Sequence, residues 1–306
     1  MSRTLNTFDA HPRSSLIVAL DFDSLSTALH FAKQVSGLVG MFKIGSQLFT
    51  SAGPDAVRQI AQLGTDIFLD LKFHDIPNTV AGAVLASAAM PAVQLVNVHA
   101  LGGTAMMRAA AQAVSAGVPM GADRTRLLAV TVLTSMDQKA IREVGLGGPP
   151  KWRVVKLAKL AQAAGVDGVV ASVEEAKAIR KACGREFLIV TPGVRFGDKD
   201  VGDKKDDQSR TATPREAIKA GADFIVVGRP ILTASDPKSA IKEIVDEIAA
   251  VLAEMSREIR TDQAGSPSAQ GRRLYPAIDT PSGREQSGKP APPIRVASAR
   301  SRTRMA

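Results

Sequence analysis

Short aliphatic runs alternate with longer alanine-rich stretches along most of the chain. The runs are continuously apolar, which is typical of parallel strands that are covered on both faces; they span Leu16–Leu20, Met41–Ile44, Asp66–Leu71, Leu95–Val98, Leu127–Val132, Gly168–Ala171, Leu188–Val190 and Phe224–Val227. Helical periodicity lies between and after them, for example at Ser24–Val35, Val57–Leu63, Arg153–Ala164, Val173–Ala182 and Pro237–Met255. Eight strand–helix units in about 240 residues predict a (β/α)8 TIM barrel, with an open, doubly wound sheet as the alternative.

Two of the predicted connections are long. The segment Gly193–Thr213 follows the seventh strand and is rich in Gly, Asp and Lys, and Ser135–Pro150 follows the fifth. Loops of this length in a compact domain are usually functional or disordered. Both follow the carboxyl ends of strands, where barrels build their active sites, so both are candidate lids.

The composition changes near Arg257. From there on Gln, Ser, Gly, Pro and Arg dominate, and the aliphatic periodicity stops. Such a segment cannot bury enough apolar surface to offset the entropy lost on ordering. The pattern therefore divides the 306 residues into an N-terminal extension at 1–13, a catalytic barrel at 14–256 and a disordered basic tail at 257–306.

The net charge of +9 belongs mostly to the tail. The segment from Arg257 to Ala306 carries 10 Lys or Arg and 4 Asp or Glu, whereas the rest of the chain is close to balance. A basic tail could make weak, salt-sensitive contacts with nucleic acid. Its single aromatic residue, Tyr275, offers little for base stacking, so we do not expect nucleic acid as a partner.

Cysteine count and hydropathy exclude several classes of protein. Cys183 is the only cysteine, so no intrachain disulfide and no cysteine-rich metal site can form. No run of about 18 apolar residues occurs, and the polar segment Met1–Arg13 lacks the apolar core of a secretory signal. We therefore expect a cytoplasmic protein without a membrane partner.

The strongest chemical signal is the run Asp66-Ile-Phe-Leu-Asp-Leu-Lys-Phe-His-Asp75. Because strand side chains alternate between faces, Asp70 and Lys72 should point the same way as Phe68. Two charges at the end of so apolar a strand are costly unless they are paired or used. A structural ion pair at the rim of the barrel is the alternative to a catalytic role.

Further polar residues end the neighbouring strands. In a barrel they would converge on one rim; they are Asp21, Lys43, His99, Thr134 and Arg229. Ser24 or Asp23 can cap the following helix, which leaves Asp21 free for another role. We interpret His99 as a hydrogen-bonded structural residue.

Two arginines suggest a phosphate site. The seventh strand ends in Thr191-Pro-Gly-Val-Arg195 and the eighth in Val226-Val-Gly-Arg229-Pro. Barrels often bind phosphate between the loops after these two strands, and arginine offers a forked donor that matches phosphate oxygens. Gly228 allows a close approach of the backbone to an anion. These residues predict an enzyme acting on a phosphorylated small molecule, but they do not identify its reaction.

The sequence resembles the orotidine 5′-phosphate decarboxylase family over about residues 14–255. The most specific match is Asp70-Leu-Lys72-Phe-His-Asp75-Ile-Pro-Asn-Thr79-Val, which follows the family signature over its whole length. Other matching segments are Ala19-Leu-Asp21, Phe42-Lys43-Ile-Gly45, Asn97-Val-His-Ala100, Val132-Leu-Thr134-Ser, Thr191-Pro-Gly193-Val-Arg195, Asp206-Asp-Gln208-Ser-Arg210 and Val227-Gly-Arg229. Leu101 departs from the family pattern, which would have a small residue there.

The resemblance implies catalytic roles for four residues. Lys72 would donate a proton to C6 of the pyrimidine, and Asp70 would lie beside the substrate carboxylate. Lys43 and Asp75 would complete an alternating Lys-Asp-Lys-Asp array. Asp75 would enter the site from the partner subunit of a homodimer, as would Thr79.

The resemblance also implies the substrate contacts, without any metal or cofactor. Asp21 and Thr79 would hold the ribose with help from Lys43, and Thr134 would hydrogen-bond the pyrimidine. The phosphate would be bound by the residues that end the seventh and eighth strands and by Gln208 on a lid loop. The implied substrate-binding set is Asp21, Lys43, Asp70, Ile76, Thr79, Thr134, Pro192, Arg195, Gln208, Gly228 and Arg229.

The resemblance thus implies decarboxylation of orotidine 5′-phosphate to UMP. The alternative is a sister enzyme on the same barrel, a Mg2+-dependent 3-keto-hexulose-phosphate decarboxylase or aldolase, which also carries an Asp-x-Lys-x-x-Asp run. The Ile-Pro-Asn-Thr-Val continuation and the Asp-Asp-Gln-Ser-Arg segment favour the first interpretation.

Overall fold

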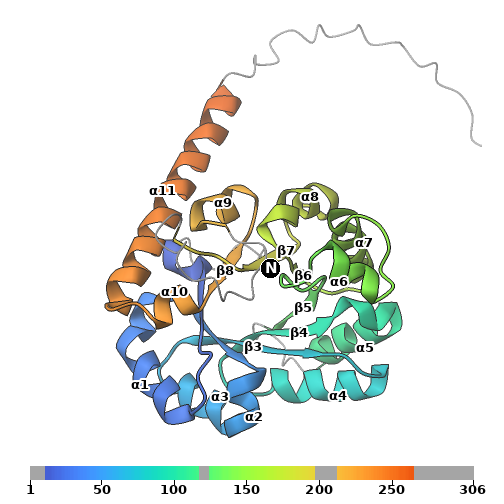
Figure 1. Cartoon of the computed structure of the whole chain (residues 1–306), viewed down its shortest axis with the longest axis horizontal. Coiled ribbons are helices and arrows are strands. Elements are labelled where there is room, and N and C mark those ends of the chain that lie inside the picture. Colours follow the sequence, from blue (N-terminus) through green and yellow to red (C-terminus); the bar gives the residue numbers. More distant parts are fainter. Residues whose placement is uncertain (1–10, 117–123, 197–211, 265–306) are drawn as a thin grey trace, which may run out of the picture. The chain divides into compact units, whose positions relative to one another are not determined.

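Eight parallel strands close into a barrel in the computed structural model of the chain, which describes residues 11–116, 124–196 and 212–264 (Figure 1). Neighbouring strands follow chain order, and β8 pairs with β1 to close the sheet. The strands are β1 (Leu16–Ala19), β2 (Met41–Gly45), β3 (Asp66–Phe73), β4 (Val93–His99), β5 (Arg126–Val130), β6 (Gly168–Val170), β7 (Leu188–Pro192) and β8 (Phe224–Val227).

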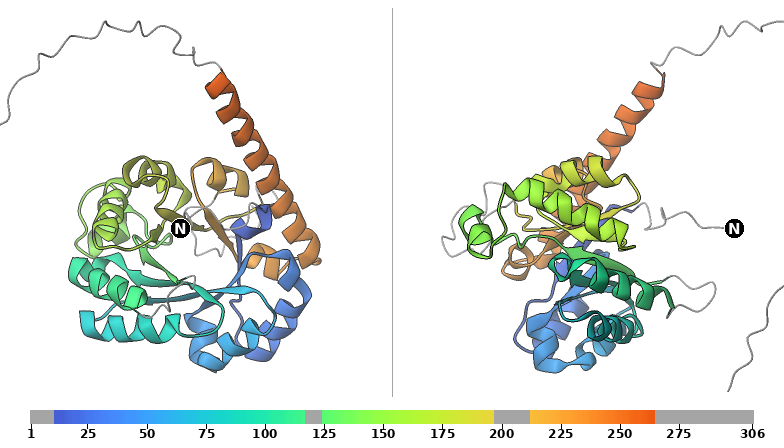
Figure 2. Two further views of the ribbon diagram at one scale, coloured as in Figure 1. Left: turned by 180° about the vertical axis from the view of Figure 1, so that it is seen from behind. Right: turned by 90° about the vertical axis from the view of Figure 1, so that its right-hand side faces the viewer.

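Helices surround this barrel, as Figure 2 also shows from behind. They are α1 (Leu25–Val35), α2 (Ser46–Ala52), α3 (Pro54–Ala61), α4 (Pro77–Ala88), α5 (Gly103–Ala116), α6 (Gln138–Glu143), α7 (Pro150–Ala163), α8 (Val173–Cys183), α9 (Pro214–Lys219), α10 (Arg229–Leu232) and α11 (Pro237–Ala264). The described segments also form the short 3-10 helices η1 (Pro12–Ser15), η2 (Ser36–Leu38) and η3 (Ala100–Gly102). Among the described residues, no helix is long and apolar enough to cross a bilayer.

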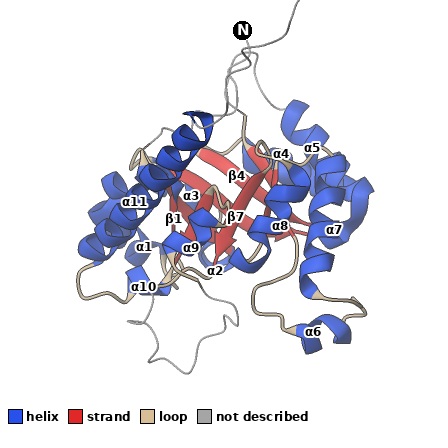
Figure 3. Cartoon of the chain, turned by 90° about the horizontal axis from the view of Figure 1, so that it is seen from above, coloured by secondary structure: helices blue, strands red, loops and turns tan. Residues whose placement is uncertain are grey.

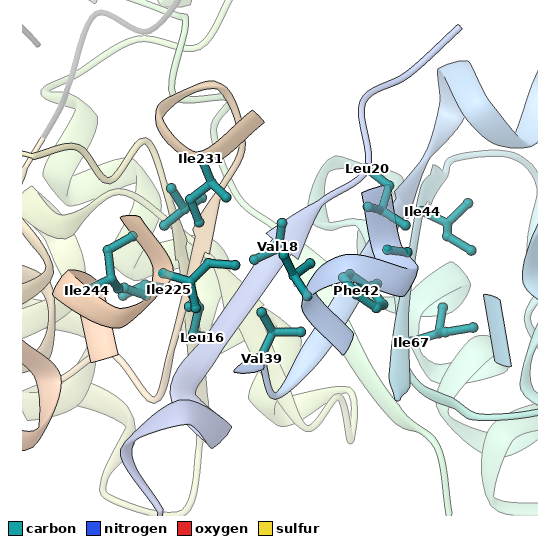
Figure 4. Packing of buried hydrophobic residues seen from close by; sticks show 14 of the residues in the cluster. Leu16, Val18, Leu20, Val39, Phe42, Ile44, Ile67, Ile225, Ile231 and Ile244 are labelled. Carbon is teal, nitrogen blue, oxygen red and sulfur yellow. The ribbon is translucent and has the colours of Figure 1, made fainter. Parts of the chain in front are cut away.

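The core has two layers because each strand is apolar on both faces. One set of side chains fills the barrel interior, including Ile17 of β1, Phe68 of β3 and Phe224 of β8. The alternate residues pack outward against the helices. Figure 4 shows this outer layer, where Val18 of β1 and Ile225 of β8 lie close to one another. Burial on both faces explains why the strands read as continuous apolar runs.

The (β/α)8 prediction is confirmed, and the open-sheet alternative is wrong because β1 and β8 pair. The predicted strands lie within two residues of the observed ones. The last helix is longer than predicted, since it continues to Ala264 instead of ending at Met255. Arg257 and Glu258 are good helix formers, so local hydrogen bonding continues after the last apolar contact. Residues 257–264, assigned to the tail by composition, are therefore helical, while residues 265–306 lie outside the described part of the chain.

The carboxyl ends of the strands carry the connections that shape the site. Figure 3 shows the short helices α6 and α10 at one end of the barrel. The long segment after β5 contains α6, which is capped by Asp137. Most of the segment after β7 lies outside the described residues. Its two described ends meet, because Val194 forms a parallel bridge with Ala212.

Candidate active site

A cavity of about 540 Å3 opens at the carboxyl ends of the strands. Its floor includes interior residues of the barrel such as Ala19 and Phe68. Nine of the residues predicted for the site line it, namely Asp21, Lys43, Asp70, Lys72, Thr134, Pro192, Arg195, Gly228 and Arg229. Strands from all parts of the chain thus bring these residues to one place, as the barrel topology requires.

Four of these residues form a ladder of alternating charge. Lys43 Nζ lies 2.9 Å from Asp21 Oδ1 and 3.5 Å from Asp70 Oδ2. Lys72 Nζ lies 2.6 Å from the other oxygen of Asp70, Oδ1. We define these four side chains as the charge ladder. Each carboxylate contacts an ammonium group, so charge that would otherwise be costly to bury is compensated.

The electrostatics keep Lys43 and Asp70 ionised. Burial by itself would raise the pKa of Asp70, but Lys43 and Lys72 hold that pKa below its usual value. Burial would lower the pKa of Lys43, but Asp70 and Asp21 raise it above its usual value. Lys43 and Asp70 are therefore both charged at neutral pH.

Residues close in sequence explain why Asp21 and Lys43 can both join the charge ladder. Ser24 accepts a hydrogen bond from the backbone N–H of Thr27 and caps α1, so Asp21 is not needed as a cap. Lys43 extends over Gly45, where an added Cβ would lie only 2.9 Å from Lys43 Nζ. A side chain at position 45 would therefore displace the ammonium group.

Arg195 and Arg229 line the cavity just after β7 and β8. Arg195 donates its backbone N–H to Ala212 O at 2.9 Å, which ties the end of β7 to the start of α9. Gly228 and Arg229 line the cavity at the end of β8 and lead into α10. Gln208, predicted to contact phosphate, lies outside the described residues.

Three predicted site residues do not line the cavity of their own chain. Asp75, Ile76 and Thr79 follow β3 and are exposed, with Ile76 66% accessible. Asp75 Oδ1 accepts a hydrogen bond from the N–H of Ile76 at 2.6 Å. The family resemblance places Asp75 and Thr79 in the site of the partner subunit, and their exposure is compatible with that expectation.

His99 is held in place by contacts with His74 and Leu101. Its ring stacks on His74 with centroids 5.3 Å apart, and its Nδ1 accepts a hydrogen bond from the N–H of Leu101. Burial, His74 and Lys72 lower the pKa of His99 to about 4. The ring is therefore neutral at pH 7, as its acceptor role requires.

Sequence reasoning missed two polar residues at the site. Gln47 lines the cavity and donates a hydrogen bond to Asp23. Asn97 received no role, yet its Nδ2 lies 2.6 Å from Asp70 Oδ1. Its signal was an amide inside the apolar stretch of β4, because a buried amide requires hydrogen-bonding partners.

Comparisons with known proteins point to one family. A model described as "Orotidine 5'-phosphate decarboxylase / HUMPS family" matches residues 14–244. The orotidine 5′-phosphate decarboxylase of Trichlorobacter lovleyi is 53% identical over 238 residues, covering 78% of this chain and 96% of that protein. The protein of the same name from Nitrosomonas europaea is 48% identical over 237 residues, covering 78% of this chain and 98% of that protein.

A solved structure agrees with the sequence relatives. The crystal structure of orotidine 5′-phosphate decarboxylase from Lactobacillus acidophilus matches with a TM-score of 0.67 at 40% identity. The match covers 76% of this chain and 98% of that chain. The fold, the charge ladder and the relatives therefore agree, and the chain belongs to the orotidine 5′-phosphate decarboxylase / HUMPS family.

Proposed function

We propose that this protein decarboxylates orotidine 5′-phosphate to UMP in de novo pyrimidine biosynthesis. The observation that carries the proposal is the charge ladder, which ends at Lys72 in a cavity that Arg195 and Arg229 also line. The names of the relatives, which are about half identical to this chain, support the same reaction.

The reaction needs an anionic group beside the carboxylate and a proton donor beside C6. The bond between C6 and the carboxylate breaks, CO2 leaves, and the electron pair stays on C6. Lys72 stabilises this pair through its positive charge and then transfers an Nζ proton to C6. Asp70 repels the substrate carboxylate, and that repulsion is relieved as CO2 departs. The fixed charges act by electrostatic preorganisation.

The remaining cavity residues bind the nucleotide. Asp21 and Lys43 hold the ribose, and Thr134 hydrogen-bonds the pyrimidine. Arg195, Gly228 and Arg229 bind the phosphate together with Gln208, and Pro192 contacts the ring. Binding energy from a phosphate remote from C6 contributes to assembling the reacting geometry.

A homodimer completes the site in this proposal. Asp75, Ile76 and Thr79 are exposed at the start of α4 and have no place in the cavity of their own chain. Two other large apolar side chains, Leu85 further along α4 and Leu101 on η3, are also exposed, and they support a covered surface there. The partner subunit's copies of the three residues would then close the other side of the cavity.

We also propose that the protein acts in the cytoplasm. Its substrate and product are nucleotide anions, which do not cross a bilayer unaided because burying a charge in hydrocarbon is costly. Activity in the soluble cytoplasmic fraction of its native cell would support this location.

The Mg2+-dependent sugar-phosphate reaction fits the site less well. Both oxygens of Asp70 already contact ammonium groups, at 2.6 Å for Lys72 Nζ and 3.5 Å for Lys43 Nζ. The donor set therefore favours the metal-independent reaction.

Loss of orotidine 5′-phosphate absorbance in EDTA tests the proposal. We expect rapid conversion to UMP by the intact protein and at least a 10²-fold loss, to order of magnitude, in Lys72→Ala. Lys33→Ala, which removes an exposed lysine of α1, is the control and should keep full activity. No turnover by folded protein, or turnover of a hexulose phosphate only with Mg2+, would reject the proposal.

A further inference from the structure

The pairing of β3 with β4 is interrupted at the charge ladder. Leu69 pairs with Val96, but the next paired residues are Phe73 and Val98. Three residues of β3, from Asp70 to Lys72, therefore lie opposite a single residue of β4. The backbone of Lys72 lies in the left-handed region, with a φ of 52°, which residues other than glycine rarely adopt. Asp70 and Lys72, at the two ends of this bulge, both line the cavity.

Asn97 is the residue of β4 opposite the bulge, and it is fully buried. Its Oδ1 accepts the backbone N–H of Lys72 at 2.8 Å, and its Nδ2 donates to Asp70 Oδ1 at 2.6 Å. The orientation of the amide is unambiguous, because a backbone N–H can only donate and a carboxylate can only accept. The side chain of Asn97 therefore replaces the missing backbone contact between β3 and β4, and it binds both Lys72 and Asp70.

We propose that Asn97 is a positioning residue that holds Lys72 in its left-handed conformation and orients the carboxylate of Asp70. This inference rests on the proposed function, since it assigns Asn97 to the geometry of the same reaction. Asn97 does not line the cavity, so it acts through Lys72 and Asp70 and not by contact with substrate.

If Asn97 only stabilised β4, any substitution that weakens this strand should have the same effect on the reaction. Two other residues of β4 serve as matched controls for this possibility. Val96, next to Asn97, is fully buried on the outer face of the same strand. Val96→Ala therefore weakens the packing of β4 without contacting the charge ladder. Gln94 hydrogen-bonds Asp66, which is an amide contact between the same two strands at the other end of the barrel.

The first test measures kcat, KM and UMP affinity for Asn97→Ala and for the two controls. We expect kcat of Asn97→Ala to fall about 100-fold, since a displacement of about 1 Å in a catalytic group costs that much. UMP affinity should change less than about threefold, because the loss belongs to the transition state. Val96→Ala and Gln94→Ala should keep kcat within about twofold. Equal losses of kcat in Asn97→Ala and Val96→Ala would overturn the proposal.

The second test uses the isosteric variant Asn97→Asp. This variant keeps the acceptor for Lys72 N–H but places a second carboxylate against Asp70. Two carboxylates sharing one site cannot both ionise freely, so the acidic limb of the pH profile of kcat/KM should move to higher pH. An unchanged pH profile would contradict the proposed contact with Asp70.

A crystal structure of Asn97→Ala separates this inference from the proposed function. We expect Lys72 to leave the left-handed region in that structure, and an unchanged φ would overturn the inference whatever the activity. If the wild-type protein fails to turn over orotidine 5′-phosphate, the proposed function falls while this geometric test still decides the role of Asn97.

Discussion

Asp70 lies between two ammonium groups and one amide at the end of β3, and it is only 8% exposed. Its position shows how the site depends on single atoms of neighbouring residues. Lys43 reaches it only because Gly45 leaves the space above the strand open. Substitutions that add one carbon atom beside the ladder should therefore affect function more than folding.

Gly45→Ala tests this expectation. The new Cβ would lie 2.9 Å from Lys43 Nζ, which is the flexible end of a long side chain and can move away. We expect kcat/KM to fall about 10- to 100-fold because Lys43 leaves its partners. The free energy of unfolding should change by about 1 kcal/mol or less.

Urea unfolding and steady-state kinetics would measure the two effects of Gly45→Ala separately. Gly64→Ala is not a suitable control, because its positive φ would add backbone strain. Gly37→Ala in η2 is better, since its added Cβ meets no neighbour within 4 Å. Wild-type kinetics in Gly45→Ala would contradict the steric account.

His99 makes stability depend on pH. The pKa of His99 is about 4 in the folded protein, below its usual value of 6.5, because burial, His74 and Lys72 disfavour the imidazolium. The unfolded chain therefore binds more protons between these values. We expect the free energy of unfolding to fall as the pH is lowered from about 6.5 to about 4.

His99→Asn should remove this part of the pH dependence. Asparagine keeps an acceptor for the N–H of Leu101 but does not titrate. Urea unfolding at several pH values between 7 and 4 measures the slope, with His30→Asn, an exposed histidine of α1, as the control for loss of one imidazole. An equal slope in His99→Asn and wild type would show that another group is responsible.

At the scale of elements, two aspartates tie strand pairs together at the end of the barrel opposite the site. Asp167, just before β6, accepts the N–H of Leu127 of β5 and pairs with Arg124. Asp223, just before β8, accepts the N–H of Ile189 of β7 at 2.7 Å. Each carboxylate thus joins two neighbouring strands at the point where their backbone pairing begins.

Asp223→Ala should lower stability without changing the reaction. Asp223 also pairs with Arg180 at 2.7 Å, so its loss removes a charge-assisted contact and a strand contact. We expect a decrease of about 2 kcal/mol in the free energy of unfolding, as for hydrogen bonds to charged groups. Asp246→Ala, which breaks the exposed Lys242–Asp246 pair of α11, should leave the urea midpoint unchanged. A fall in kcat of folded Asp223→Ala would contradict this division between the two ends of the barrel.

At the scale of the whole molecule, closure of the barrel by β1 and β8 brings Asp21 and Arg229 to one cavity although they are far apart in sequence. Closure does not bring in Asp75 and Thr79, which stay exposed on the same chain. The proposed homodimer therefore has a functional consequence. Two variants that are inactive alone should complement each other when their subunits mix.

Mixed dimers of Lys72→Ala and Asp75→Asn test this sharing. In a mixed dimer one site carries both substitutions and the other carries neither. A statistical mixture should therefore recover about a quarter of the wild-type activity, as the symmetry of a two-fold dimer requires. The control mixes Lys72→Ala with Asp70→Asn, which both lie in the cavity of their own chain and should show no recovery. No recovery in the first mixture would place Asp75 outside the partner's site.

The positions of the strands and of most site residues could be predicted from the sequence because their causes are local. Continuous apolar runs identified the strands, and the alternation along β3 correctly grouped Asp70 with Phe68. Polar residues at strand ends converge in any parallel barrel, so Asp21, Lys43 and Arg229 were found without coordinates. The family resemblance, and not the pattern, supplied the reaction and the proposed roles of Asp75 and Thr79 in a partner subunit.

The sequence by itself determined the kinds of element, their order and the residues at the strand ends. Only the tertiary structure decided that the sheet closes, that Asn97 spans the bulge between Asp70 and Lys72, and that Gly45 clears the path of Lys43. The physical reason is that periodicity and strand polarity act between near neighbours, whereas hydrogen bonds and steric clearances depend on which distant atoms meet. A pattern can place a side chain on a face, but it cannot measure the 2.6 Å that separates Asn97 from Asp70.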